Sequence, residues 1–338
     1  MRIGTAVRLL LTFAGVSLAV PAHSQETTLI FATVNPPSAH LTVNVLVPWA
    51  QRVNERGKGI VRLDIRDGLT LANLGNAYDR VLTDVVQIAW GTHSAVGGKF
   101  RKTEVIALPF VAPVSAEEGS VALWRLYKAG MLDSDYDEVV PLYLCQIANS
   151  GVQFSKPPKT LDTLAGYKMI VSGRIPGLSA TRLGATPASI SLNEMYEAIQ
   201  RGTVDGVFTG WTAFQPFKLA EVTTYHVDVS LSGASGYVFM SKKKWETLSP
   251  AVRRVLEENS GEAQSKAFGG FWDRIAEETK AALKKDPKHT VVSLSPEQQK
   301  KWQEAITPVV AEWVKSTPDG EKVLSTYRGL LQKVKAGG

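Results

Sequence analysis

Short apolar runs alternate with amphipathic segments along most of the chain, and this alternation constrains the fold more than any other feature of the sequence. In the first part, "TLIFATV" (28–34), "IVRLDIR" (60–66) and "VVQIAW" (85–90) have the length and the β-branched content of strands. Apolar residues at helical spacing separate these runs, over about 40–56 and 75–84. This order predicts an α/β fold in which helices cover a sheet.

The same alternation starts again in the second part of the chain. "YKMIV" (167–171), "ASI" (188–190) and "TVDGVFTG" (203–210) are predicted strands, and helical patterns over 177–184 and 193–202 lie between them. Two similar α/β units in tandem indicate two lobes of comparable size. A chain of 338 residues is long enough to bury two cores.

The last third of the chain has a different pattern. After two further predicted strands, 139–144 and 235–243, a serine–proline cap at 249–250 begins a helical pattern that reaches about Lys285. A helix of that length spans roughly 50 Å, enough to run along both lobes. Three glycines are candidate kinks in it: Gly261, Gly269 and Gly270.

The first 24 residues have the layout of a secretory signal peptide. Arg2 and Arg8 precede an apolar run of about a dozen residues, and small residues follow up to Ser24. A membrane span would need about twenty apolar residues, and no later segment is that apolar. No cysteine follows Ser24 directly, which argues against a lipid anchor. We therefore predict cleavage near Ser24 and a soluble mature protein in the periplasm.

Charge and motif content narrow the possible functions. The basic residues are scattered apart from "SKKK" (241–244) and "KKDPK" (284–288), which are typical of solvated helix ends, so no nucleic-acid partner is expected. The chain has neither a Gly-x-Ser-x-Gly elbow nor a His-Glu-x-x-His motif. The lone Cys145, in the apolar run "VVPLYLC", is expected to be buried and inert. These observations argue against an enzyme.

The histidines after position 24 are separated too widely in sequence to suggest a metal site. They are His40, His93, His226 and His289. His40 and His93 follow predicted strands, where ligand clefts form, but a hydrogen-bonded imidazole in a loop is the favoured interpretation of each. We predict neither a metal nor a cofactor.

Aromatic and polar residues gather where predicted strands end. Asn35 follows the first strand, Trp90 and His93 end the third, and Thr209 and Trp211 end the last strand of the second unit. In open α/β sheets, ligands bind at the carboxyl ends of the strands. These residues predict a cleft for a small polar molecule with one apolar face. Core packing of either tryptophan fits the sequence equally well.

Arg174 is the basic residue at these strand ends. It follows the "YKMIV" strand, just before a predicted helix whose unpaired N–H groups and dipole favour an anion. A guanidinium there can bind a carboxylate through two parallel hydrogen bonds. The alternative is a solvated charge in a surface loop. We predict that Arg174 binds an acid ligand.

The segment 164–214, "LAGYKMIVSGRIPGLSATRLGATPASISLNEMYEAIQRGTVDGVFTGWTAF", resembles the central signature of the substrate-binding subunits of tripartite ATP-independent periplasmic (TRAP) transporters. Members of that family carry "lkGlKiR", "lGAtPv" and "evYeALqrGvvDG". "FATVNPPSAH" (31–40) and "LANLGNAYDRVLTDVVQIAWG" (71–91) also fit the family, so the resemblance covers essentially the whole mature chain. The matching residues of the central segment are Gly166, Lys168, Gly184, Ala185, Thr186, Pro187, Glu194, Tyr196, Gln200, Gly202, Asp205 and Gly206.

The resemblance implies a two-lobed periplasmic binding protein, whose lobes are joined by hinge strands, crossed by a long helix, and closed around the ligand. On this basis we place residues 25–147 and about 236–275 in lobe I, and residues 148–235 and about 276–338 in lobe II. Ligand contacts are expected from both lobes. Lobe I would supply Asn35, Trp90 and His93, and lobe II would supply Arg174, Thr209 and Trp211.

The resemblance also implies a function, the capture of a small organic acid by a monomeric protein and its delivery to a small and a large membrane subunit. Relatives usually bind the carboxylate with the arginine of "KiR", which is Ile170 here, and Arg174 is the nearest substitute. Trp90 and Trp211 favour uronic or aryl acids over short dicarboxylates. The alternatives are a binding protein for another importer or for a sensor, and, less favoured, a periplasmic enzyme.

Overall fold

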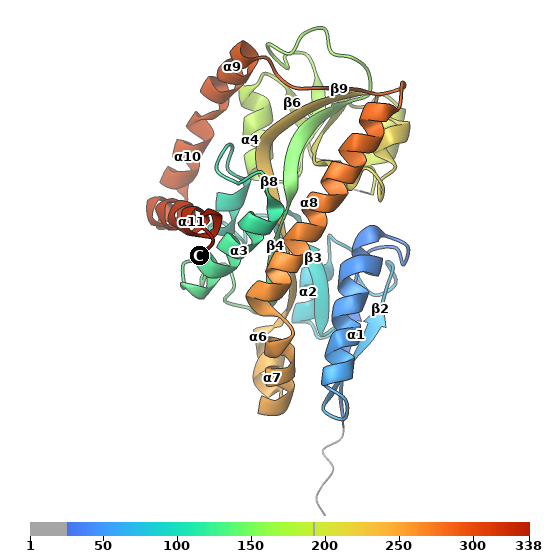
Figure 1. Cartoon of the computed structure of the whole chain (residues 1–338), viewed down its shortest axis with the longest axis vertical. Coiled ribbons are helices and arrows are strands. Elements are labelled where there is room, and N and C mark those ends of the chain that lie inside the picture. The colour runs from blue at the N-terminus through green and yellow to red at the C-terminus, as the bar shows by residue number, and fades with distance from the viewer. Residues whose placement is uncertain (1–25, 192) are drawn as a thin grey trace, which may run out of the picture.

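The computed structural model describes residues 26–191 and 193–338, so the predicted signal peptide lies outside the described residues. Within these residues, one continuous sheet of nine strands has the order β2-β1-β3-β8-β4-β7-β5-β6, with β9 paired to β8. The sheet runs through both halves of the molecule (Figure 1). The strands are β1 (Thr27–Ala32), β2 (Val61–Arg66), β3 (Ile88–Thr92), β4 (Val139–Phe154), β5 (Lys168–Ile170), β6 (Thr186–Ala188), β7 (Gly206–Thr209), β8 (Tyr225–Ser241) and β9 (Thr290–Val292).

Helices cover this sheet, as the alternating pattern predicts. The α-helices are α1 (Val47–Arg56), α2 (Ala77–Leu82), α3 (Ala116–Lys128), α4 (Arg174–Arg182), α5 (Met195–Gln200), α6 (Lys242–Thr247), α7 (Pro250–Glu258), α8 (Gly261–Lys285), α9 (Pro296–Ile306), α10 (Pro308–Ser316) and α11 (Gly320–Lys335). The shorter turns are a π-helix, η1 (Thr42–Leu46), and the 3-10 helices η2 (His93–Ala95), η3 (Thr103–Ala107), η4 (Trp211–Ala213) and η5 (Leu219–Glu221).

Two long antiparallel strands, β4 and β8, connect the halves of the sheet. Their pairing runs from Val139 opposite Ser241 to Phe154 opposite Tyr225. On one side β8 pairs with β3, next to the parallel strands β1 and β2, and on the other side β4 pairs with β7, next to β5 and β6. We call β1–β3 with α1–α3 the first lobe, and β5–β7 and β9 with α4, α5 and α9 the second lobe. The predicted two lobes and hinge strands are confirmed.

Both hinge strands are longer than the sequence predicts. Each was expected at one end only, over 139–144 and 235–243, whereas the structure extends them to Phe154 and back to Tyr225. The extension of β8 includes "SLSGA" (230–234), whose small residues have little strand propensity. Pairing with β4 along almost its whole length compensates for that low propensity, and this pairing is invisible in the sequence.

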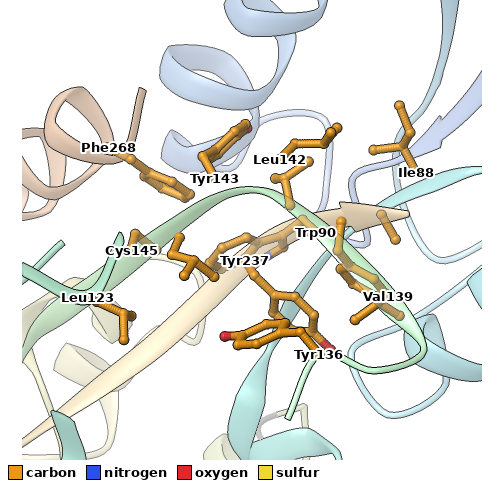
Figure 2. Packing of buried hydrophobic residues seen from close by; sticks show 14 of the residues in the cluster. Ile88, Trp90, Leu123, Tyr136, Val139, Leu142, Tyr143, Cys145, Tyr237 and Phe268 are labelled. Carbon is orange, nitrogen blue, oxygen red and sulfur yellow. The ribbon is translucent and has the colours of Figure 1, made fainter. Parts of the chain in front are cut away.

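Aromatic side chains build the core of the first lobe. Trp49 is fully buried, and its ring centroid lies 5.2 Å from that of Phe31 and 5.3 Å from that of Tyr143. Figure 2 shows Tyr143, Phe268 and Cys145 gathered around the hinge strands. Cys145 is fully buried, as predicted, and burial raises the pKa of its thiol well above the usual range.

Helix α8 ties the two lobes together. Its Phe268 and Trp272 belong to the core of the first lobe, and its Ala276 and Leu283 belong to a core of the second lobe. In Figure 1 α8 (orange) runs alongside both halves of the sheet. The predicted long helix is therefore present, with a break before Gly261 that separates α7 from α8. The positive φ of Gly261, 75°, makes this break the one predicted kink that is a true helix boundary.

The C-terminal helices return to the first lobe. Trp313 of α10 and Tyr327 of α11 are fully buried in the first-lobe core, whereas Trp302 of α9 is buried in the second lobe. The predicted division of the chain assigns everything from about residue 276 onward to lobe II. That division stays a prediction, and these cores favour moving α10 and α11 to lobe I. Within the described ranges, no helix is both long and apolar enough to cross a membrane.

Candidate functional site

A cavity of about 290 Å³ lies between the two lobes, near the lower end of the volumes of small-molecule sites. Its walls come from loops after β1, β3, β5 and β7, from the middle of both hinge strands, and from α8. The chain irregularities of β4 between Ile147 and Val152 fall in this part of the hinge. Bulges of this kind re-aim side chains, and Ile147 and Ala148 both line the cavity.

A second, wider hollow of about 850 Å³ adjoins the cavity. It is lined largely by small and polar residues, among them Asn73, Ser94, Ser189 and Asn193. Arg174 lines both spaces, so it lies where they meet. Ser172 and Gly173 line both spaces too, so the two spaces adjoin at the turn between β5 and α4.

Arg174 begins helix α4, three residues earlier than predicted. Gly173 precedes it with a φ of 95°, a conformation that favours glycine, and this turn directs the chain from β5 into the helix. The Nη2 atom of Arg174 lies 2.6 Å from Oε2 of Glu104, which belongs to η3 of the first lobe. The Nε atom of Arg174 is buried, and no described residue supplies it with a hydrogen-bond partner. The arginine is therefore placed at the cavity, but one edge of its guanidinium already holds a carboxylate.

His93 lines the cavity with both ring nitrogens occupied. Its Nδ1 lies 2.8 Å from Oγ of Ser235, its Nε2 lies 2.7 Å from the hydroxyl of Tyr136, and its ring stacks on Tyr237 at 4.3 Å. Burial lowers the pKa of His93 to about 3, so the imidazole is neutral. His93 is thus a structural part of the wall that presents a ring face or edge, in line with the favoured interpretation from sequence.

Three other predicted residues also line the cavity. Asn35 is partly buried and donates through Nδ2 to the backbone oxygen of Thr33. Trp90 is almost fully buried, and its ring lies against Gly236, where a Cβ atom would be 2.1 Å from Cη2 of the indole. Thr209 ends β7 at the cavity. Glycine at position 236 is therefore what allows the Trp90 ring to approach the hinge strand so closely.

Trp211 is the predicted site residue that the structure places elsewhere. It is absent from the cavity wall, is buried in the second-lobe core, and stacks on Phe214 at 5.5 Å. Its Nε1 lies 3.3 Å from Oδ1 of Asp228. The core-packing alternative is thus correct for this tryptophan, because the turn η4 directs position 211 inward and exposes Thr212 and Ala213 to the cavity instead.

Sequence reasoning missed several residues of the wall. Arg101 and Glu104 come from the loop between β3 and α3, and Trp272 and Ile275 come from α8. Only "GGKFR", a glycine pair close to a basic residue, hinted at the loop. The contribution of α8 has no local signal, since Trp272 and Ile275 look like ordinary core residues of an amphipathic helix. Leu41, Phe208 and Phe217 also line the cavity.

Two histidines form a pair, His226 on the hinge strand β8 and His289 just before β9. Nε2 of His226 is 3.0 Å from Nδ1 of His289, and Nδ1 of His226 is 2.8 Å from Oε1 of Gln153. Gln153 also donates to the backbone oxygen of Thr209 at 3.0 Å. Oδ2 of Asp286 lies 3.9 Å from Nε2 of His289. Burial, with a smaller contribution from His289, lowers the pKa of His226 to about 4.

We expect acid to destabilise the protein through His226. The unfolded chain takes up this proton near the usual pKa of 6.5, whereas the folded protein takes it up only near about 4. The stabilisation is therefore complete above the unfolded value and is lost as pH falls through this range. Urea midpoints measured at several pH values should show a shallower decline for His226→Gln than for the wild type. Identical slopes in the two proteins would show that His226 does not cause the acid sensitivity.

No group of three or more His, Cys, Asp or Glu residues suited to a metal ion occurs among residues 26–191 and 193–338. A few charged side chains line the cavity, and most of the remaining wall is apolar or aromatic. That combination suits a small molecule with a charged group and an apolar body.

Comparison with known proteins gives the family. The family model for bacterial extracellular solute-binding proteins, family 7 (DctP), matches residues 31–317. The chain is 27% identical over 323 residues to a protein of Comamonas testosteroni named outer membrane transporter protein TsaT, which covers 92% of this chain and 94% of that protein. It is also 31% identical over 161 residues to the C4-dicarboxylate-binding periplasmic protein DctP of Rhodobacter capsulatus, covering 47% of this chain and 48% of that protein.

Solved structures with the same fold include TRAP solute-binding proteins. One, from a marine metagenome and described as specific for aromatic acid ligands, has a TM-score of 0.84 at 28% identity and covers 91% of this chain and 99% of its own. Another, from Rhodoferax ferrireducens in complex with copurified benzoate, has a TM-score of 0.84 at 26% identity and covers 92% of this chain and 100% of its own. The family comprises solute-binding proteins, not enzymes, and its relatives include periplasmic proteins. The chain belongs to this DctP family and is a solute-binding protein of the TRAP transporter type.

Proposed function

We propose that this protein captures a small aromatic acid in the cavity between its lobes and delivers it to the membrane subunits of a TRAP transporter. The observation that carries the proposal is the interlobe cavity itself, which is small, mostly apolar and lined by Arg174. A ligand that bridges the two lobes would favour the closed arrangement because it binds the closed form more tightly than the open form.

The shape and chemistry of the cavity favour an aryl acid over a uronic acid. Phe208, Phe217, Trp90 and Trp272 supply aromatic surface, and Leu41 supplies apolar surface. A sugar acid has a hydroxyl on nearly every carbon, and burying those hydroxyls without partners is costly. A single carboxylate on an aromatic ring leaves few polar groups to satisfy. Relatives support the same class, since one is described as specific for aromatic acids and another was found with benzoate.

We expect aromatic monoacids to raise the thermal unfolding temperature of the mature protein. A screen should include benzoate, 3-hydroxybenzoate, mandelate, succinate and glucuronate. Ligand at a hundred times its Kd stabilises the folded state by about 2.7 kcal/mol, a readily measured shift. The aromatic acids should give the largest shifts. If no acid changes the unfolding temperature, the proposed function is wrong, and if glucuronate leads, the ligand class is wrong.

We also propose that the protein acts in the periplasm, together with two membrane subunits. The predicted signal peptide and the periplasmic relatives support export to the periplasm, and the family supports a small and a large membrane subunit as partners. Fractionation should recover a monomer in the periplasm, and mass spectrometry should show an N-terminus near residue 25. Uptake of the labelled acid should require the chain together with both membrane subunits. Uptake that depends instead on an ATP-driven importer would favour the alternative partner.

A further inference from the structure

The cavity carries very few charged side chains. In the part of the chain that the structure describes, three of them line it: Arg101, Glu104 and Arg174. Two histidines also line it: His40, and His93, which is held neutral by burial that lowers its pKa to about 3. The rest of the wall is apolar or uncharged. The charge balance of the cavity therefore depends on how these three side chains are paired.

Glu104 and Arg174 neutralise each other across the lobes. Their contact, 2.6 Å between Oε2 and Nη2, joins η3 of the first lobe to the start of α4 in the second. Both side chains are largely shielded from solvent, with 21% of Glu104 and 29% of Arg174 exposed. Screening by water and salt is weaker in such a position than at an open surface. The pair therefore contributes hydrogen-bond donors to the cavity but no net charge.

Arg101 has no such partner. No acidic side chain in residues 26–191 and 193–338 lies within ion-pair distance of its guanidinium, although both neighbouring lysines are paired, Lys99 with Asp137 and Glu138, and Lys102 with Asp319. The backbone of Arg101 is held by a hydrogen bond from Nε1 of Trp313 to its carbonyl oxygen. Its Nη2 atom lies 4.0 Å from the place where a Cβ of Gly98 would be, beside a glycine turn that lines the cavity.

From this arrangement we infer that the cavity selects acids with a single carboxylate, and that Glu104 is the residue that rejects a second one. The inference rests on the proposed function. Two arginines and one glutamate leave one uncompensated positive charge, which a monocarboxylate balances. A dicarboxylate would leave a net negative charge inside a mostly apolar site, next to Glu104, where an unpaired charge is strongly unfavourable.

Matched acids test this charge rule. Isothermal titration calorimetry at about pH 8, where histidine is neutral, would compare 3-hydroxybenzoate with isophthalate and butyrate with succinate. The first pair differs by a hydroxyl against a carboxylate on the same ring position. We expect wild type to bind the monoacid of a pair at least about tenfold more tightly, the equivalent of one charge-assisted contact.

Two variants test the contributions of Glu104 and Arg101 one at a time. Glu104→Gln keeps the size of the side chain and should reduce the preference for the monoacid about tenfold or more, chiefly by improving binding of the diacid. Arg101→Gln should weaken monoacid binding by a similar factor, with an unchanged circular dichroism spectrum. Glu197→Gln, in an exposed pair with Arg201 on α5, is the matched control and should change neither affinity.

The possible results are distinct. If wild type binds monoacids and diacids equally, or if Glu104→Gln leaves their ratio unchanged, the charge rule is wrong while the proposed function stands. If wild type binds none of the acids, the proposed function fails, and the charge rule fails with it.

Discussion

Arg174→Ala is expected to weaken the binding of an aromatic monoacid at least tenfold while the protein stays folded. Arg174 lines the cavity, its Nε atom is buried without a described partner, and charge-assisted hydrogen bonds contribute about 1.5–3 kcal/mol. A factor of ten corresponds to about 1.4 kcal/mol, so the loss of one such bond is sufficient. The substitution also leaves the Glu104 carboxylate without its partner near the bound acid. Calorimetry on the purified mature protein measures the effect.

The matched control for this prediction is Arg201→Ala. It removes the same charge from an exposed ion pair with Glu197 on α5, outside the cavity, and should leave affinity unchanged. A double variant, Arg174→Ala with Glu104→Gln, restores the net charge of the cavity but not the hydrogen bonds of the guanidinium. The affinity that remains lost in the double variant measures direct contact. Unchanged affinity in Arg174→Ala itself would exclude Arg174 as the residue that binds the acid.

Gly269→Ala is expected to lower the free energy of unfolding, by about 1–3 kcal/mol, as is typical of overpacking. Gly269 lies where α8 crosses the start of α3, and a Cβ there would be 2.3 Å from the backbone oxygen of Ala116 and 2.6 Å from Cα of Glu117. These atoms are backbone, so the helices must separate. Separation would also stretch the hydrogen bonds by which Asp273 of α8 accepts from the N–H groups of Ala116 and Glu117, at 2.6 and 3.0 Å.

The neighbouring glycine supplies the control. At Gly270 a Cβ would meet only the carboxylate end of Glu117, with Oε2 at 2.8 Å, which is the far end of a flexible and exposed side chain. Gly270→Ala should therefore leave stability unchanged or raise it by up to about 1 kcal/mol, through the higher helix propensity of alanine. Urea denaturation of the two variants in parallel measures this difference in stability. Equal midpoints would mean that α3 and α8 are not packed as closely as the structure has them.

Local patterns in the sequence predicted much of the fold. The strands at 28–34, 60–66 and 85–90 appear as β1, β2 and β3, because alternation and β-branched content are properties of each segment by itself. The long helical pattern to Lys285 was also predicted, together with Gly261 as a break. By contrast, the full length of β4 and β8 was missed, since small residues in their middle become strand only through pairing between segments about ninety residues apart.

Like the fold, the candidate site could be predicted from the sequence only in part. Asn35, Trp90, His93, Arg174 and Thr209 were predicted from one rule, that polar and aromatic residues at strand ends line clefts, and all of them line the cavity. The rule failed for Trp211, because a single turn decides whether a side chain points inward or outward. It missed Glu104 altogether, which meets Arg174 only because the lobes bring together residues 70 positions apart.

The sequence alone determined the α/β architecture, the two units and the placement of an arginine at a strand end. Those features follow from periodicity and propensity, which act over a few residues at a time. Tertiary structure alone decided which side chains share the cavity and what net charge they carry. Charge pairing depends on distances of a few ångströms between side chains of different lobes, and no local pattern encodes such distances. Whether Arg174 is a free cation or half of the pair with Glu104 is therefore a property of the folded molecule.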